Sequence, residues 1–177
     1  MRKIFILMFI ANVAVTLVSL AVLPERVATH FGAGGMADGW ASNQVNALIT
    51  TGVHVILFCC FYFTDRLIFL FPPSLVNLPN KEYWLDPANK PRTIEKIQGL
   101  MWNLGAVMFL FLLVLGLLAL QANLAKTVRL NEPVFFAALG ALLVYTIGWL
   151  VVFYRTFRIP GNNNGANRQA GRRPGLV

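Results

Sequence analysis

A histidine and an aspartate, His30 and Asp38, stand in the glycine-rich stretch HFGAGGMADGW, residues 30–40. An imidazole close to a carboxylate can act as an acid–base pair. With Glu25, the two side chains also offer nitrogen and oxygen ligands for a divalent metal, although the spacing matches no established metal motif. The plainest alternative needs no chemistry, because glycines allow tight turns and an aspartate accepts hydrogen bonds from backbone amides. We therefore predict a hydrogen-bonded turn, with no metal, no cofactor and no assigned catalytic residue.

Three polar residues interrupt long apolar runs. Counted from the ends of those runs, Asn12, His54 and Tyr145 fall near the middle of a bilayer, where a polar side chain is costly and usually faces other helices. Thr50 lies one helical turn before His54 and shares its face. We favour a network of hydrogen bonds between helices. The alternative is a proton-linked or ligand-contacting site, because histidine side chains titrate near neutral pH.

The composition is that of a membrane protein. Hydrophobic residues make up 57% of the chain and charged residues only 12%, whereas soluble domains are about one quarter charged. Crossing the hydrocarbon core takes roughly 20 apolar residues. Four runs meet that length: residues 4–23, 45–64, 98–120 and 133–154. The sequence thus predicts an all-α integral membrane protein, a four-helix bundle over residues 1–159, with a basic, flexible tail over residues 160–177.

The lysines and arginines predict the orientation in the membrane. Of 15 such residues, only Arg26, Lys126 and Arg129 lie in the first and third loops. The others lie at the N-terminus, in the second loop and in the tail, and cytoplasmic segments carry the excess of positive charge. We expect both termini on the cytoplasmic side and the loop of residues 30–40 outside. A secretory signal cleaved near Ser19 is the alternative, which would leave three spans and an outer N-terminus.

Several function classes receive no support from the sequence. The net charge of +8 does not indicate nucleic-acid binding, because the basic residues flank apolar runs and determine topology there. The chain lacks the motifs G-x-x-x-x-G-K-[ST], H-E-x-x-H, G-x-S-x-G and C-x-x-C, which are typical of phosphate sites, metalloproteases, hydrolases and redox proteins. The adjacent Cys59 and Cys60 point about 100° apart on a helix, so we expect small packing residues rather than a disulfide.

The second loop contains the stretch NLPNKEYWLDPANKPR, residues 77–92, with three prolines. Prolines bias their neighbours toward extended or turn conformations. We predict an ordered cytoplasmic loop in which Trp84 anchors at the membrane interface, with a short helix over residues 93–96. The preceding apolar segment, residues 67–71, is either an interfacial segment or a continuation of the second helix.

The stretch LPERVATHFGAGGMADGWASN, residues 23–43, resembles the N-terminal module of SdpI-like bacterial membrane proteins, a domain of unknown function. NLPNKEYWL is similar to a stretch that follows the module in stand-alone relatives. The resemblance implies a location in a bacterial cytoplasmic (inner) membrane. It also implies immunity or signal transduction toward a secreted killing peptide. It implies binding roles for His30, Phe31, Gly35, Asp38 and Trp40 in the outer loop, and contacts for Asn77, Asn80 and Trp84 in the inner loop. The matching residues of the module are Leu23, Pro24, Val27, His30, Phe31, Gly35, Asp38, Gly39, Trp40 and Ser42.

Two departures from this family are visible. This chain has Gly32 where the family pattern has asparagine, and the further C-terminal spans of full-length relatives are not recognisable. The favoured function is a small membrane binding or accessory protein that contacts a larger membrane complex or a peptide through its outer loop. The alternative is a small membrane enzyme or proton-linked carrier that uses His30 and Asp38, or His54.

Overall fold

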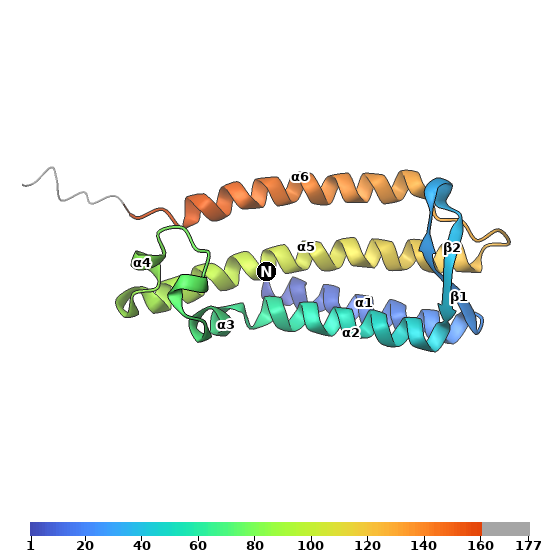
Figure 1. The fold of residues 1–177 in the computed structure, drawn as a ribbon, viewed down its shortest axis with the longest axis horizontal. Helices are drawn as coiled ribbons and strands as arrows, with labels where there is room; N and C mark the ends of the chain where they lie inside the picture. Colours follow the sequence, from blue (N-terminus) through green and yellow to red (C-terminus); the bar gives the residue numbers. More distant parts are fainter. Residues whose placement is uncertain (161–177) are drawn as a thin grey trace, which may run out of the picture.

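The computed structural model describes residues 1–160 and is mostly helical. Within these residues, four helices are long and apolar enough to cross a membrane, so the chain is a multi-pass membrane protein. Helix α1 packs against α2 and α5, whereas α6 packs against α5 (Figure 1). The predicted flexible tail lies outside the described residues, apart from its first position. The four helices are α1 (Arg2–Val22), α2 (Asn43–Tyr62), α5 (Lys90–Leu124) and α6 (Glu132–Thr156).

The third helix is much longer than the apolar run that predicted it. Helix α5 begins at Lys90 rather than near residue 98 and absorbs the short helix expected over residues 93–96. Pro91 lies in its first turn, where a proline removes no helical hydrogen bond and its fixed φ suits the helix. Polar residues therefore carry the helix beyond the hydrophobic stretch, which hydropathy alone does not detect.

The segment between α1 and α2 is a β-hairpin, so the expectation of an all-α chain is incomplete. Strands β1 (Arg26–Phe31) and β2 (Ala37–Ser42) pair antiparallel, with a short 3₁₀ turn, η1 (Ala33–Gly35), between them. Gly34 and Gly35 have φ values of 78° and 72°, which glycine adopts without a steric penalty. The hairpin lies at one end of the bundle (Figure 1). Sequence analysis predicted the turn but missed its two strands.

The second loop folds at the opposite end of the bundle (Figure 1). Helix α3 (Thr64–Leu70) follows α2 after a break at Phe63 and buries none of its residues. Next come η2 (Pro73–Leu75), α4 (Lys81–Trp84) and η3 (Pro87–Asn89). A small apolar core joins this loop to α5 and to the end of α6, and its buried members are Val76, Leu78, Trp84, Ile97 and Phe157.

Aromatic packing holds α1, α2 and α5 together near the same end. Phe5 is fully buried and stacks on Phe58 with ring centroids 5.1 Å apart. Gly105 of α5 makes this possible, since a Cβ there would lie only 2.7 Å from Phe5 Cε2. Cys59 and Cys60 are free and exposed on α2, so they take no part in this packing between helices. Their neighbour Phe58 supplies the packing face instead.

Candidate functional site

The hairpin brings His30 and Asp38 into direct contact. His30 Nδ1 lies 2.5 Å from Asp38 Oδ1, and the two side chains are 74% and 54% exposed. A Cβ on Gly32 would lie 2.6 Å from Asp38 Oδ2, and one on Gly39 would lie 2.7 Å from His30 Cβ. Gly39 therefore allows the backbone to pass close to His30, whereas a side chain at position 32 would require the exposed Asp38 carboxylate to shift.

The structure does not assemble the alternative metal site. Among the described residues, no three His, Cys, Asp or Glu side chains gather closely enough to hold a metal ion. Glu25 precedes β1, whereas His30 lies near its far end, and five extended residues cover roughly 16 Å. The strand thus separates Glu25 from His30 and Asp38, and the described residues do not gather these three side chains at one point.

The hairpin tip is fastened to the loop between α5 and α6. The Gly35 carbonyl accepts a hydrogen bond from the Leu130 N–H at 2.8 Å, and Arg129 Nε donates to the Gly34 carbonyl at 2.7 Å. Gly35 is buried, and a Cβ on it would lie 2.5 Å from the Leu130 carbonyl oxygen. Gly35 thus fixes the position of the hairpin, whereas the resemblance implied a binding role.

The base of the hairpin is fastened by Asn123, a residue that sequence analysis missed. Its side chain accepts from the Ala28 N–H at 2.7 Å and donates to the Ala28 carbonyl at 3.1 Å. The amide therefore pairs with β1 as a neighbouring strand would. The available signal was an asparagine near the end of a largely apolar stretch, LLALQANL.

Asn43, at the start of α2, is a second missed residue. It donates to the Leu20 and Leu23 carbonyls at 3.1 and 3.2 Å, so it caps the last turn of α1. Its backbone N–H also donates to the Glu25 carbonyl at 2.7 Å. Together these bonds set the angle at which α1, the hairpin and α2 meet.

An apolar cavity of about 540 Å³ lies between the hairpin, α5 and α6. We call it the hairpin cavity. His30 and Phe31 contribute to its wall, and Glu132 is its only acidic lining residue within the described chain. Trp40 lies elsewhere on the hairpin, 42% exposed, with the Arg26 guanidinium carbon 5.7 Å from its ring centroid. The main apolar residues that line the hairpin cavity are Phe31, Leu115, Ala119, Leu130, Phe135 and Phe136.

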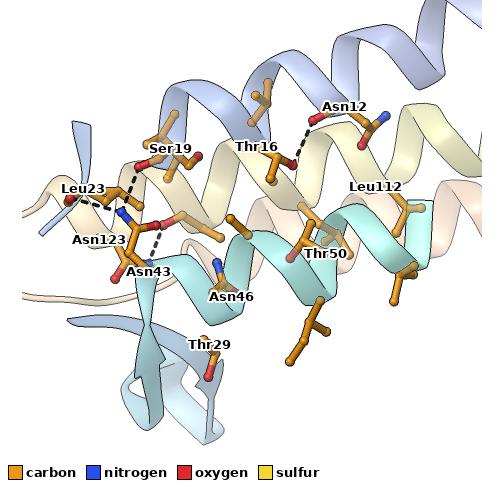
Figure 2. A pocket seen from close by; sticks show the side chains of 18 of the residues that line it. Asn12, Thr16, Ser19, Leu23, Thr29, Asn43, Asn46, Thr50, Leu112 and Asn123 are labelled. Atoms are coloured by element: carbon orange, nitrogen blue, oxygen red, sulfur yellow. Dashed lines mark hydrogen bonds between the residues drawn. The ribbon is translucent and has the colours of Figure 1, made fainter. Parts of the chain in front are cut away.

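A second cavity, of about 300 Å³, lies inside the bundle between α1, α2 and α5, next to β1 (Figure 2). We call it the polar cavity. Asn12, Thr50 and His54 line it, as do Asn46 and Thr29, all of which carry hydrogen-bonding groups. Asn12 donates to the Met8 and Phe109 carbonyls, both at 2.8 Å. Asn12 thus forms a hydrogen bond between α1 and α5, whereas His54 Nδ1 has no partner within the described chain.

Tyr145 does not join Asn12 and His54. Its hydroxyl donates to Asn103 Oδ1 of α5, and Trp149 of α6 donates to the Leu100 carbonyl at 3.2 Å. These two bonds hold α6 against α5, on the side away from the polar cavity's lining. The three residues predicted to form one constellation therefore divide between a cavity and a helix contact.

The inner-loop residues hold the end of α6. Asn80 Nδ2 and Trp84 Nε1 each donate to the Phe157 carbonyl at 2.8 Å, and Trp84 is 1% exposed. Asn80 adopts a left-handed conformation with φ 53° just before α4. Asn77 lies beside Asn80 in the wall of a surface depression. Two of these three positions are thus explained by the fold itself.

Comparison with known protein families matches residues 7–53 to a domain of unknown function, DUF1648. The match covers most of α1, the whole hairpin and the first half of α2, which are the elements that carry the His30–Asp38 pair and two walls of the polar cavity. Neither a curated protein nor a solved structure matches the chain.

Proposed function

We propose that this chain is a binding protein of the bacterial cytoplasmic membrane that holds the apolar face of an amphipathic peptide, or of a partner's segment, in the hairpin cavity. The observation that carries the proposal is the cavity itself, about 540 Å³ and lined mostly by apolar side chains. Ligand sites have this size and composition, with a few polar groups that set orientation. His30 lines the cavity and contacts the exposed Asp38, so the two side chains offer polar contacts at the edge of the cavity.

Charge supports an orientation with the hairpin outside. The start of α1 and the end of α6 lie at the end of the bundle opposite the hairpin (Figure 1). Near the hairpin the basic residues are Arg26, Lys126 and Arg129, whereas most other lysines and arginines belong to the opposite end or to the tail. By the positive-inside rule, the termini are cytoplasmic and the hairpin meets molecules outside. The resemblance to SdpI-like proteins makes immunity or signalling toward a secreted peptide the specific form of this function.

The test is purification of the tagged, full-length protein from native membranes in a mild detergent, with mass spectrometry of what is retained. We expect a stoichiometric peptide or membrane protein with the wild type. Ala33→Trp places an indole in the hairpin cavity, because Ala33 is exposed and lines only that cavity, and it should abolish retention. Ala141→Trp, at an exposed position on α6, is the matched control and should retain the partner.

The Asp38→Asn variant tests the rim. It removes the charge of an exposed pair, which contributes at most about 1 kcal/mol to folding, so the protein should persist while retention falls. Recovery of the chain as a monomer or homodimer, or equal retention by Ala33→Trp and Ala141→Trp, would contradict the proposal.

A second candidate, acid–base chemistry at the outer surface, has one observation in its favour. Asp38 contacts Nδ1 of His30 at 2.5 Å, an arrangement that orients an imidazole so that its other nitrogen can exchange a proton. The pair is largely exposed, and His30 lies in the wall of an apolar cavity. For this reason we favour binding over catalysis.

A further inference from the structure

The polar cavity has a lining that packing does not explain. It lies within the apolar part of the bundle, yet three helices and β1 direct hydrogen-bonding side chains toward it (Figure 2). Polar groups in a membrane interior are costly and usually pair with one another. Asn12, Asn43 and Asn123 do make hydrogen bonds to backbone groups. The lining nevertheless encloses about 300 Å³ of space, which is at the lower end of the range for ligand sites.

Two buried polar atoms in this lining have no hydrogen-bond partner within the described chain. They are His54 Nδ1 and Asn43 Oδ1, on residues that are 5% and 6% exposed. Native proteins rarely leave such atoms unpaired, because an unmade buried hydrogen bond costs free energy. Both residues line the polar cavity from α2. The two residues are eleven positions apart on α2, which corresponds to about 16 Å along the helix axis.

The lining also defines the charge of an occupant. No Asp, Glu, Lys or Arg belongs to the described residues around the cavity. Asparagine, threonine and neutral histidine side chains can donate and accept hydrogen bonds but cannot neutralise an ion. A charged group would lose its hydration without gaining an opposite charge. The occupant that this lining favours is therefore uncharged and rich in hydroxyl or amide groups.

One wall of the cavity reaches the outer surface of the bundle. Ile49 and Val53 of α2 line the cavity although they are 60% and 45% exposed. Leu112 and Gly116 of α5 also line it, and α6 contributes no lining residue among those described. The apolar edge between α2 and α5 thus faces the hydrocarbon region, so an apolar chain can pass through it from the bilayer.

We propose that the polar cavity binds the uncharged head of a single-chain amphiphile, with its acyl chain leaving between α2 and α5 into the bilayer. Hydroxyl or amide groups of the head bond the unpaired Nδ1 of His54, near the edge where the acyl chain leaves. Water bonds the unpaired Oδ1 of Asn43, about 16 Å away along α2, and fills the space that remains. This site is distinct from the hairpin cavity and does not depend on the peptide-binding proposal.

The experiment uses the full-length protein in phosphatidylcholine nanodiscs and a 1-monoacylglycerol that carries a photoreactive diazirine in its acyl chain. We expect saturable labelling of peptides from α2 and α5 near Val53 or Leu112. Unlabelled monoacylglycerol and an N-acylethanolamine of equal chain length should compete. The fatty acid of that length should not, because its head is an anion.

Gly116→Leu fills the cavity from α5, and it has room because a Cβ there meets only Val15 Cγ1 at an ordinary 3.4 Å. Labelling should fall by about tenfold, equivalent to 1.4 kcal/mol of binding free energy. Gly148→Leu, at an exposed α6 position with nothing within 4 Å, should label like the wild type. Thr50→Leu fills the cavity from α2 and serves if Gly116→Leu fails to fold.

Three results would overturn the proposal. The first is labelling that does not saturate, and the second is labelling that survives in a folded cavity-filling variant; either result would mean that the cavity holds water alone. The third is labelling that the fatty acid displaces equally, which would mean that the cavity does not select an uncharged head. The hairpin-cavity variant Ala33→Trp should label normally, so failure of this proposal and failure of the peptide proposal give different patterns.

Discussion

Replacing Asn123 by leucine tests how the hairpin is fixed to the bundle. Leucine has nearly the shape of asparagine but cannot make either bond to the backbone of Ala28, which is 3% exposed. The Ala28 N–H and carbonyl then lose their partners in a buried position. Each orphaned group costs about 1–3 kcal/mol, and partial relaxation of an end strand lowers the sum, so we expect about 2–4 kcal/mol of destabilisation.

The measurement is thermal unfolding of the purified protein in one detergent. For a chain of this size, 1 kcal/mol corresponds to about 2–4 °C in Tm, so Asn123→Leu should lower Tm by about 5–15 °C. Gln121→Leu is the matched control, since Gln121 is an exposed residue of the same helix. Its change should stay within about 0.5 kcal/mol.

Hydrogen exchange separates a local from a global effect. The Ala28 amide should lose its protection in Asn123→Leu, whereas amides in the middle of α1 should keep theirs under native conditions. If Asn123→Leu unfolds at the same temperature as Gln121→Leu and keeps the Ala28 amide protected, the side chain does not hold the strand. The account of a hairpin fastened by an amide would then be wrong.

Two further substitutions test the other fixed points. Gly35→Ala should lower the free energy of unfolding by well over the roughly 1–2 kcal/mol that a positive φ costs, since its Cβ would meet a backbone carbonyl at 2.5 Å. Gly34→Ala has nothing within 4 Å of its Cβ and should lose only the part due to φ. Equal losses of Tm in the two variants would contradict this. Trp84→Phe removes the indole N–H that donates to the Phe157 carbonyl and should lower the free energy of unfolding by about 1–3 kcal/mol. The measurement is Tm, with Trp40→Phe as the exposed control. An unchanged Tm in Trp84→Phe would contradict this.

Hydropathy was sufficient to predict the four long helices because each span needs a long uncharged run, and such runs are visible in one sequence. Three of the four ranges agree with the structure to within two residues at each end. The start of α5 was missed because its first turns are polar and stabilised by contacts with Trp84, whose carbonyl accepts from Thr93 Oγ1 at 2.6 Å.

The positions of polar side chains could be predicted only in depth, not in direction. Asn12, His54 and Tyr145 were assigned to one level of the membrane, but the angle of each residue around its helix depends on how the helices pack. Asn12 and His54 face the polar cavity, whereas Tyr145 bonds Asn103. Composition and periodicity contain no information on which of several neighbours a helix face will meet, so the division into two groups required coordinates.

The two cavities share a wall, and this determines which substitutions are informative. Thr29 and Phe31 of β1 line both cavities, as do Leu115 and Ala119 of α5. A change at any of these positions alters both volumes, so loss of peptide retention there would not distinguish one site from the other. Ala33 and Gly116 each line a single cavity. Since the shared strand is fastened at both ends, only variants at such unshared positions assign a ligand to its site.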